Sequence, residues 1–255
     1  MTADNPKPKI PMRLKPLLPL IIILALFAAA KLFFLARYHL PIWDEAVYLG
    51  MGKYFYSLGS SGLWEILRPL GMPLITGLVW KLQLLPQILF SEIITVAFGA
   101  GSIALCYLIG KRLFSRKVAI LAAALLAASP LFFLYSSYVL TEVPSLFFVL
   151  ATIYFFVNKR YYLCGASAAL AMLFKFPNGL MLAAITAAVI IPRLISQKPQ
   201  WWPLIKTSAA FFMVTLPFLV FNYVFYRSFT SNPYDAVFRP FILGAWHQSN
   251  PAKAI

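Results

Sequence analysis

The chain has 255 residues, of which 62% are hydrophobic and 11% are charged, whereas an average soluble protein has about 25% charged residues. It carries 22 Lys and Arg against 7 Asp and Glu, a formal net charge of +15. The basic residues fall in short loops between long apolar runs, a pattern that sets the orientation of membrane proteins, and not on one surface as nucleic-acid binding requires. The composition therefore excludes an ordinary soluble domain and predicts a protein of the lipid bilayer with no nucleic-acid partner.

The N-terminal part predicts a cytoplasmic tail, one span and a long outer loop. Residues 1–16 contain four basic residues, which place them in the cytoplasm by the positive-inside rule. The apolar run Leu17–Ala36 then crosses outward, and a cleaved secretory signal stays open as the alternative. Residues 38–86 form the outer loop. Within it Pro73–Leu85, which is short and interrupted by a lysine and a glutamine, is expected to be a helix at the membrane interface rather than a span.

Alternation between the two faces orders the remaining spans. The basic cluster at 111–117 should be cytoplasmic, so Gln87–Ile109 crosses inward, and the basic turn at 158–160 should be cytoplasmic as well. The further expected spans are Val118–Tyr135, Val143–Phe156, Tyr162–Phe174, Leu180–Ile191 and Leu204–Phe225. The predicted fold is all-α, an integral-membrane, polytopic helical bundle of about seven spans in residues 17–226, followed by residues 227–255 as an outer segment.

Five ionisable residues share the outer face in this topology. They are Asp44, Glu45, Arg68, Glu142 and Lys175, and they lie at the ends of different elements. An ionisable residue beside apolar spans is a candidate for function because its burial in lipid is costly. Three carboxylates and two cations on one side of the bilayer are what a site for a charged lipid headgroup would need.

Each of these residues also has a purely structural interpretation. Asp44 and Glu45 can open a short helix, because acidic residues in a first turn complement the helix dipole by about 0.3–1 kcal/mol. Arg68 can contact lipid phosphates from a loop, and Glu142 can follow a helix cap. Lys175 can extend its charge to the membrane interface. It is the order of the residues along the chain that favours a functional interpretation.

A series of short motifs follows this order along the chain. They are Asp44-Glu45, Arg68-Pro69 before Pro73-Leu74-Ile75, Gly110-Lys111-Arg112-Leu113-Phe114, Ser129-Pro130, Ser136-Ser137-Tyr138 with Thr141-Glu142, and Leu173-Phe174-Lys175. Together they resemble the N-terminal half of a GT-C glycosyltransferase. The dolichyl-phosphate-mannose protein mannosyltransferases and the bacterial lipid A aminoarabinose transferases are the groups that they resemble most. The resemblance covers the region from residue 15 to residue 230.

The resemblance implies a role for each candidate residue. Asp44 matches the catalytic base, with Glu45 supporting it, and Arg68 matches the position that holds the lipid phosphate. The substrate-binding candidates of the same outer cavity are Tyr48, Arg68, Glu142 and Lys175. Two features depart from the protein mannosyltransferases. Arg68-Pro69-Leu70 stands where they have His-Pro-Pro, and the chain stops at Ile255, where such enzymes continue with more spans, so we expect it to be incomplete relative to the family.

The chemistry suits these residue types independently of the resemblance. A sugar on a polyprenyl monophosphate is already activated, so transfer needs a base for the acceptor hydroxyl, worth about 10²–10⁴-fold, and cations against the departing phosphate. Asp44 supplies the base, and Arg68 and Lys175 supply the cations. A single in-line displacement predicts inversion at the anomeric carbon. No cofactor is required, and a divalent metal is compatible with this chemistry but not demanded by it. Cys106 and Cys164 lie within apolar runs and have neither metal-ligand spacing nor a disulfide pattern.

A transporter or lipid flippase and an inactive membrane scaffold are the alternative classes. A transporter would have inverted repeats and ionisable residues near the middle of its spans. No repeat is visible here and the acidic residues gather at one face, although Lys31 and Glu92 sit nearer apolar runs. A scaffold would not need the acidic pair. The sequence therefore predicts a multi-pass glycosyltransferase of the cell membrane, with the active site on the extracytoplasmic face and a protein, lipid or glycan hydroxyl as acceptor.

Overall fold

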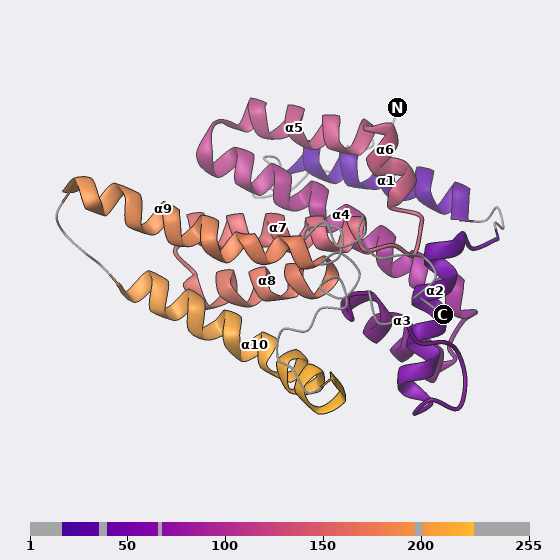
Figure 1. Ribbon diagram of the computed structural model, residues 1–255. Coiled ribbons are helices and arrows are strands. Elements are labelled where there is room, and N and C mark those ends of the chain that lie inside the picture. Colours follow the sequence, from indigo (N-terminus) through magenta and orange to yellow (C-terminus); the bar gives the residue numbers. More distant parts are fainter. Residues whose placement is uncertain (1–16, 36–39, 66–67, 197–200, 227–255) are drawn as a thin grey trace, which may run out of the picture.

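The computed structural model describes residues 17–35, 40–65, 68–196 and 201–226, and throughout these ranges every regular element is a helix (Figure 1). The helices in chain order are α1 (Leu18–Leu35), α2 (Trp43–Tyr56), α3 (Gly71–Leu82), α4 (Gln87–Leu113), α5 (Arg116–Ala128), α6 (Pro130–Tyr135), α7 (Glu142–Val157), α8 (Tyr161–Phe174), the 3₁₀ turn η1 (Phe176–Gly179), α9 (Leu180–Ser196) and α10 (Trp202–Tyr226). The all-α prediction is confirmed for this part of the chain. The predicted tail at 1–16 and the outer segment at 227–255 lie outside the described residues.

Three helices are long and apolar enough to cross a membrane. They are α1, α4 and the Trp202–Val224 part of α10. Three further stretches are apolar but shorter, namely α7, α8 and Phe176–Ile191. A hydrocarbon core of ~30 Å needs about 20 helical residues, so length and composition support three spans. The predicted number of seven stays a prediction.

The run expected as one span over Val118–Tyr135 is divided into two helices. α5 ends at Ala128, and Ser129 adopts an extended conformation with ψ 119° before Pro130 opens α6. Proline disfavours helical geometry in the residue before it and is well suited to the first position of a new helix. The Ser129 hydroxyl accepts a hydrogen bond from Phe132 N at 3.4 Å, which caps the second helix.

α2 and α3 are in close contact within the segment 38–86. A Cβ added to Gly52 would lie 2.4 Å from Thr76 Oγ1, and one added to Gly77 would lie 2.5 Å from Gly52 O. The glycines therefore allow the two backbones to approach, and the Thr76 hydroxyl then donates to Tyr48 O at 2.9 Å. The helix predicted at Pro73–Leu85 is present as α3, and it ends where Gln83 takes a left-handed conformation with φ 52°.

The longer helices pack side by side, so the connections between them lie at one or the other end of the bundle. α8 packs against α7 and α10, and α4 packs against α5 and α7. In Figure 1 the connections from α4 to α5 and from α7 to α8 lie at the left, whereas α2, α3 and the start of α7 lie towards the right. The basic connections at 111–117 and 158–160 are thus at the end of the bundle opposite α2 and α3.

Candidate active site

A cleft of about 460 Å³ opens where α2, the segment before α3, the start of α7 and the end of α8 meet. Its lining residues are Asp44, Tyr48, Arg68, Pro69, Leu140, Thr141, Glu142, Lys175, Phe176 and Pro177. Five of the six residues predicted for the site are among them, although up to 131 positions separate them in the chain (Lys175 minus Asp44). The structure therefore brings all the predicted site residues except Glu45 together in one cleft.

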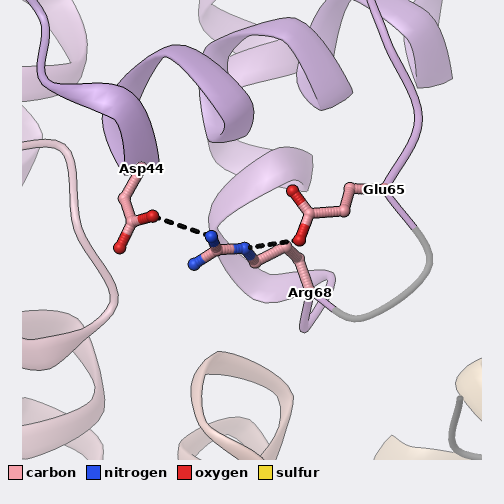
Figure 2. A network of polar contacts seen from close by, with 3 residues as sticks. All are labelled: Asp44, Glu65 and Arg68. Atoms are coloured by element: carbon pink, nitrogen blue, oxygen red, sulfur yellow. Dashed lines mark hydrogen bonds and ion pairs between the residues drawn. The ribbon is translucent and has the colours of Figure 1, made fainter. Parts of the chain in front are cut away.

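Arg68 occupies the centre of the charged part of this cleft. Figure 2 shows its guanidinium between two carboxylates: Nη2 donates to Asp44 Oδ1 at 2.7 Å, and Nε donates to Glu65 Oε1 at 3.1 Å. The Arg68 side chain is 22% exposed, that of Glu65 31% and that of Asp44 46%. Partial burial works to lower the pKa of Arg68, but hydrogen bonds to Asp44 and Tyr48 raise this pKa by more, so the guanidinium is firmly charged.

Tyr48 lies one helical turn after Asp44 on α2, and its ring centroid is 5.5 Å from Arg68 Cζ. Burial raises the pKa of the Tyr48 hydroxyl, and side-chain hydrogen bonds with Thr141 and Arg68 offset only part of that rise. The phenol therefore stays protonated at neutral pH. In the cleft it can orient a substrate oxygen through hydrogen bonds, but it cannot serve as the base.

A second ion pair lies across the cleft, between α7 and the end of α8. Lys175 Nζ donates to Glu142 Oε1 at 3.2 Å, and both side chains are more than 40% exposed. An exposed ion pair contributes about 0.2–1 kcal/mol, so an incoming anion can draw Lys175 away at little cost. The helix start predicted at Thr141-Glu142 is confirmed, because Thr141 precedes the first residue of α7. The Thr141 hydroxyl makes no capping hydrogen bond and instead interacts with Tyr48.

Glu45, predicted as the carboxylate that supports Asp44, does not line the cleft. Its side chain is fully buried, with Oε2 accepting from Ile42 N at 2.9 Å and Oε1 accepting from Val139 N at 2.7 Å. The first contact fastens the start of α2, and the second joins that start to the segment before α7. These contacts make Glu45 a residue that positions Asp44, and they do not bring it to the reacting groups.

Lys31 holds the same segment through contacts of its own. It is fully buried on α1, donates to Phe133 O and to Ser137 Oγ (2.8 Å), and lies 3.6 Å from the centroid of the Phe133 ring. These contacts join α1 to α6 and to the start of the 136–141 segment. Because Glu45 holds Val139 in that segment, the backbone that leads to Glu142 is fastened at two points.

Sequence reasoning did not assign Glu65 or Thr141 to the site, where Thr141 lines the cleft and Glu65 contacts Arg68. Glu65 precedes Arg68 by three positions and is one of only seven acidic residues, which is a signal that the sequence does contain. No comparable signal exists for the contact of Thr141 with Tyr48, because that contact depends on how α2 meets α7.

Comparison of the sequence with known families identifies the family of the chain. The sequence model of the dolichyl-phosphate-mannose-protein mannosyltransferase family matches residues 68–221, which is more than half of the chain. The chain belongs to this family. It is therefore a membrane glycosyltransferase of the GT-C type, as the motifs predicted. Searches of curated proteins and of solved structures found no match.

The family match begins at Arg68 and includes Glu142 and Lys175. Asp44 and Glu65 lie before it, so their membership of the site rests on their contacts with Arg68. Within the described residues no group of three or more His, Cys, Asp or Glu side chains is arranged to hold a metal ion.

Proposed function

We propose that this glycosyltransferase moves a sugar from a polyprenyl-phosphate donor to an acceptor hydroxyl in the cleft beside Arg68, with inversion at the anomeric carbon. The observation that supports the proposal is the position of Arg68, a firmly charged guanidinium that contacts Asp44 at 2.7 Å and lines the same cleft as Lys175. A base and two cations are thus within reach of one substrate. The family's name supports a mannosyl donor on a polyprenyl phosphate such as dolichyl phosphate.

The reaction requires one proton transfer and one displacement. Arg68 contacts Asp44 through Oδ1, and we assign Oδ2 of Asp44 to take the proton from the acceptor hydroxyl. The acceptor oxygen forms a bond to the anomeric carbon while the bond from that carbon to the phosphate oxygen breaks. The departing phosphate keeps the electron pair, and Arg68 and Lys175 stabilise its charge.

The distribution of charge between the two ends of the bundle supports an extracytoplasmic site. The basic connections at 111–117 and 158–160 lie opposite α2 and α3, and positive loops favour the cytoplasm. The cleft residues are at the α2 end, which would then face outward. There the donor phosphate can reach Arg68 while the polyprenyl chain stays in the bilayer.

Binding of polyprenyl phosphate tests this proposal directly. Arg68→Ala in the full-length protein in nanodiscs should weaken polyprenyl phosphate affinity by about 10- to 100-fold, because a charge-assisted hydrogen bond contributes about 1.5–3 kcal/mol. Arg112→Ala is the matched control, since Arg112 is an exposed arginine on the last turn of α4 at the opposite end. Unchanged lipid-phosphate affinity in Arg68→Ala, together with lost acceptor binding, would reverse the assignment.

A further inference from the structure

Arg68 has two carboxylate partners, and only one of them changes charge in the proposed reaction. Asp44 and Glu65 each accept one hydrogen bond from the guanidinium, at 2.7 and 3.1 Å, through different nitrogen atoms. When Asp44 takes the acceptor proton it becomes neutral, and its attraction for Arg68 falls. The departing phosphate gains negative charge in the same step.

From this geometry we propose that Glu65 is a positioning residue, which keeps Arg68 in the cleft while its second partner changes from Asp44 to the donor phosphate. The proposal rests on the function proposed above. Glu65 contacts Arg68 through Nε, on the opposite side of the guanidinium from the Asp44 contact (Figure 2). Its negative charge is constant through the reaction because it neither donates nor accepts a proton.

The burial of the two side chains supports this role. Arg68 is 22% and Glu65 is 31% exposed, so the pair is less screened by solvent than the pair of Lys175 with Glu142. A charge that is only partly solvated responds more strongly to its neighbours. Without Glu65, Asp44 would be the only carboxylate partner of the guanidinium beside its contact with Tyr48. Protonation of Asp44 would then leave Arg68 without a charged partner while negative charge develops on the phosphate.

The test uses the affinity of the full-length protein in nanodiscs for polyprenyl phosphate. Glu65→Gln keeps the shape and removes the charge, and it should weaken affinity by about 1.5- to fivefold, as the loss of a partly exposed ion pair implies. In the Arg68→Ala background the same substitution should have no further effect. Glu65→Asp, which restores the charge one methylene shorter, should recover part of the affinity.

Glu142→Gln is the matched control, because Glu142 is a carboxylate of the same cleft that pairs with Lys175. Its effect on affinity, of either sign, should persist in the Arg68→Ala background. The inference is overturned if Glu65→Gln binds as the wild type does, or if its effect is equally large without Arg68. Loss of affinity in Arg68→Ala alone would retain the proposed function and reject the role of Glu65. Unchanged affinity in Arg68→Ala would reject both.

Discussion

Replacing Asp44 by Asn should remove proton transfer and leave substrate binding in the cleft intact. The amide keeps the shape of the side chain and an oxygen that can accept from Arg68, but it cannot act as the base. We expect turnover to fall by about 10²–10⁴-fold. Donor affinity should not fall, because the substitution removes a negative charge that competes with the phosphate for Arg68.

The structure limits how far this substitution can disturb folding. Asp44 is 46% exposed and its contact is with Arg68, so the lost ion pair costs about 0.2–1 kcal/mol. The lost charge in the first turn of α2 costs about another 0.3–1 kcal/mol. A fall of turnover by 10² corresponds to about 2.7 kcal/mol in the activation barrier. The loss of activity should therefore exceed what destabilisation explains.

The assay uses membranes of a strain that lacks the gene and is complemented with each variant. Mass spectrometry follows the loss of the lipid-linked sugar and the appearance of polyprenyl phosphate, with the native acceptors present. Glu142→Gln serves as the control, since it removes one carboxylate from the other side of the cleft. Near-normal turnover in Asp44→Asn would refute the role of Asp44 as the base and leave it only the structural role of an acidic residue at the start of α2. Equal losses in both variants would assign the effect to cleft charge instead of to proton transfer.

Four further outcomes follow from the same structure. Lys175→Ala should weaken polyprenyl phosphate binding by less than Arg68→Ala does, because Lys175 is the more exposed cation. Arg68→Lys should give an intermediate loss of this affinity, since it keeps the charge without the planar fork. Glu45→Gln should lower the thermal midpoint of unfolding, because one of two backbone N–H groups loses its carboxylate oxygen. Its turnover should fall by less than that of Asp44→Asn. In a background without native cysteines, a Cys at Ser60 should react with an impermeant reagent added outside and one at Ser115 should not. Outside labelling at Ser115 would overturn the proposed orientation.

Alternation of basic loops and apolar runs was enough to predict that distant residues meet. Asp44, Arg68, Glu142 and Lys175 each lie beside an element end that the positive-inside rule assigns to one face, and the structure places all four in one cleft. Helix geometry explains why Glu45 differs from its neighbour. Successive residues of an α-helix point about 100° apart, and here Asp44 lines the cleft while Glu45 points into the packed interior. The pairing of Arg68 with Asp44 could not be predicted from the sequence, because it depends on the course of the chain between α2 and α3.

The lengths of α7 and α8 give a physical reason for paired charges in this cleft. At 1.5 Å per residue, the 16 residues of α7 rise about 24 Å and the 14 of α8 about 21 Å, less than a hydrocarbon core of ~30 Å. If the turn at 158–160 lies at the cytoplasmic boundary, as we propose, then Glu142 and Lys175 lie several ångströms below the outer boundary. A lone charge at that depth is costly, and each cation of the cleft has a carboxylate partner. The donor phosphate can then take the place of one carboxylate as the partner of the cation, so the cation stays paired throughout the transfer.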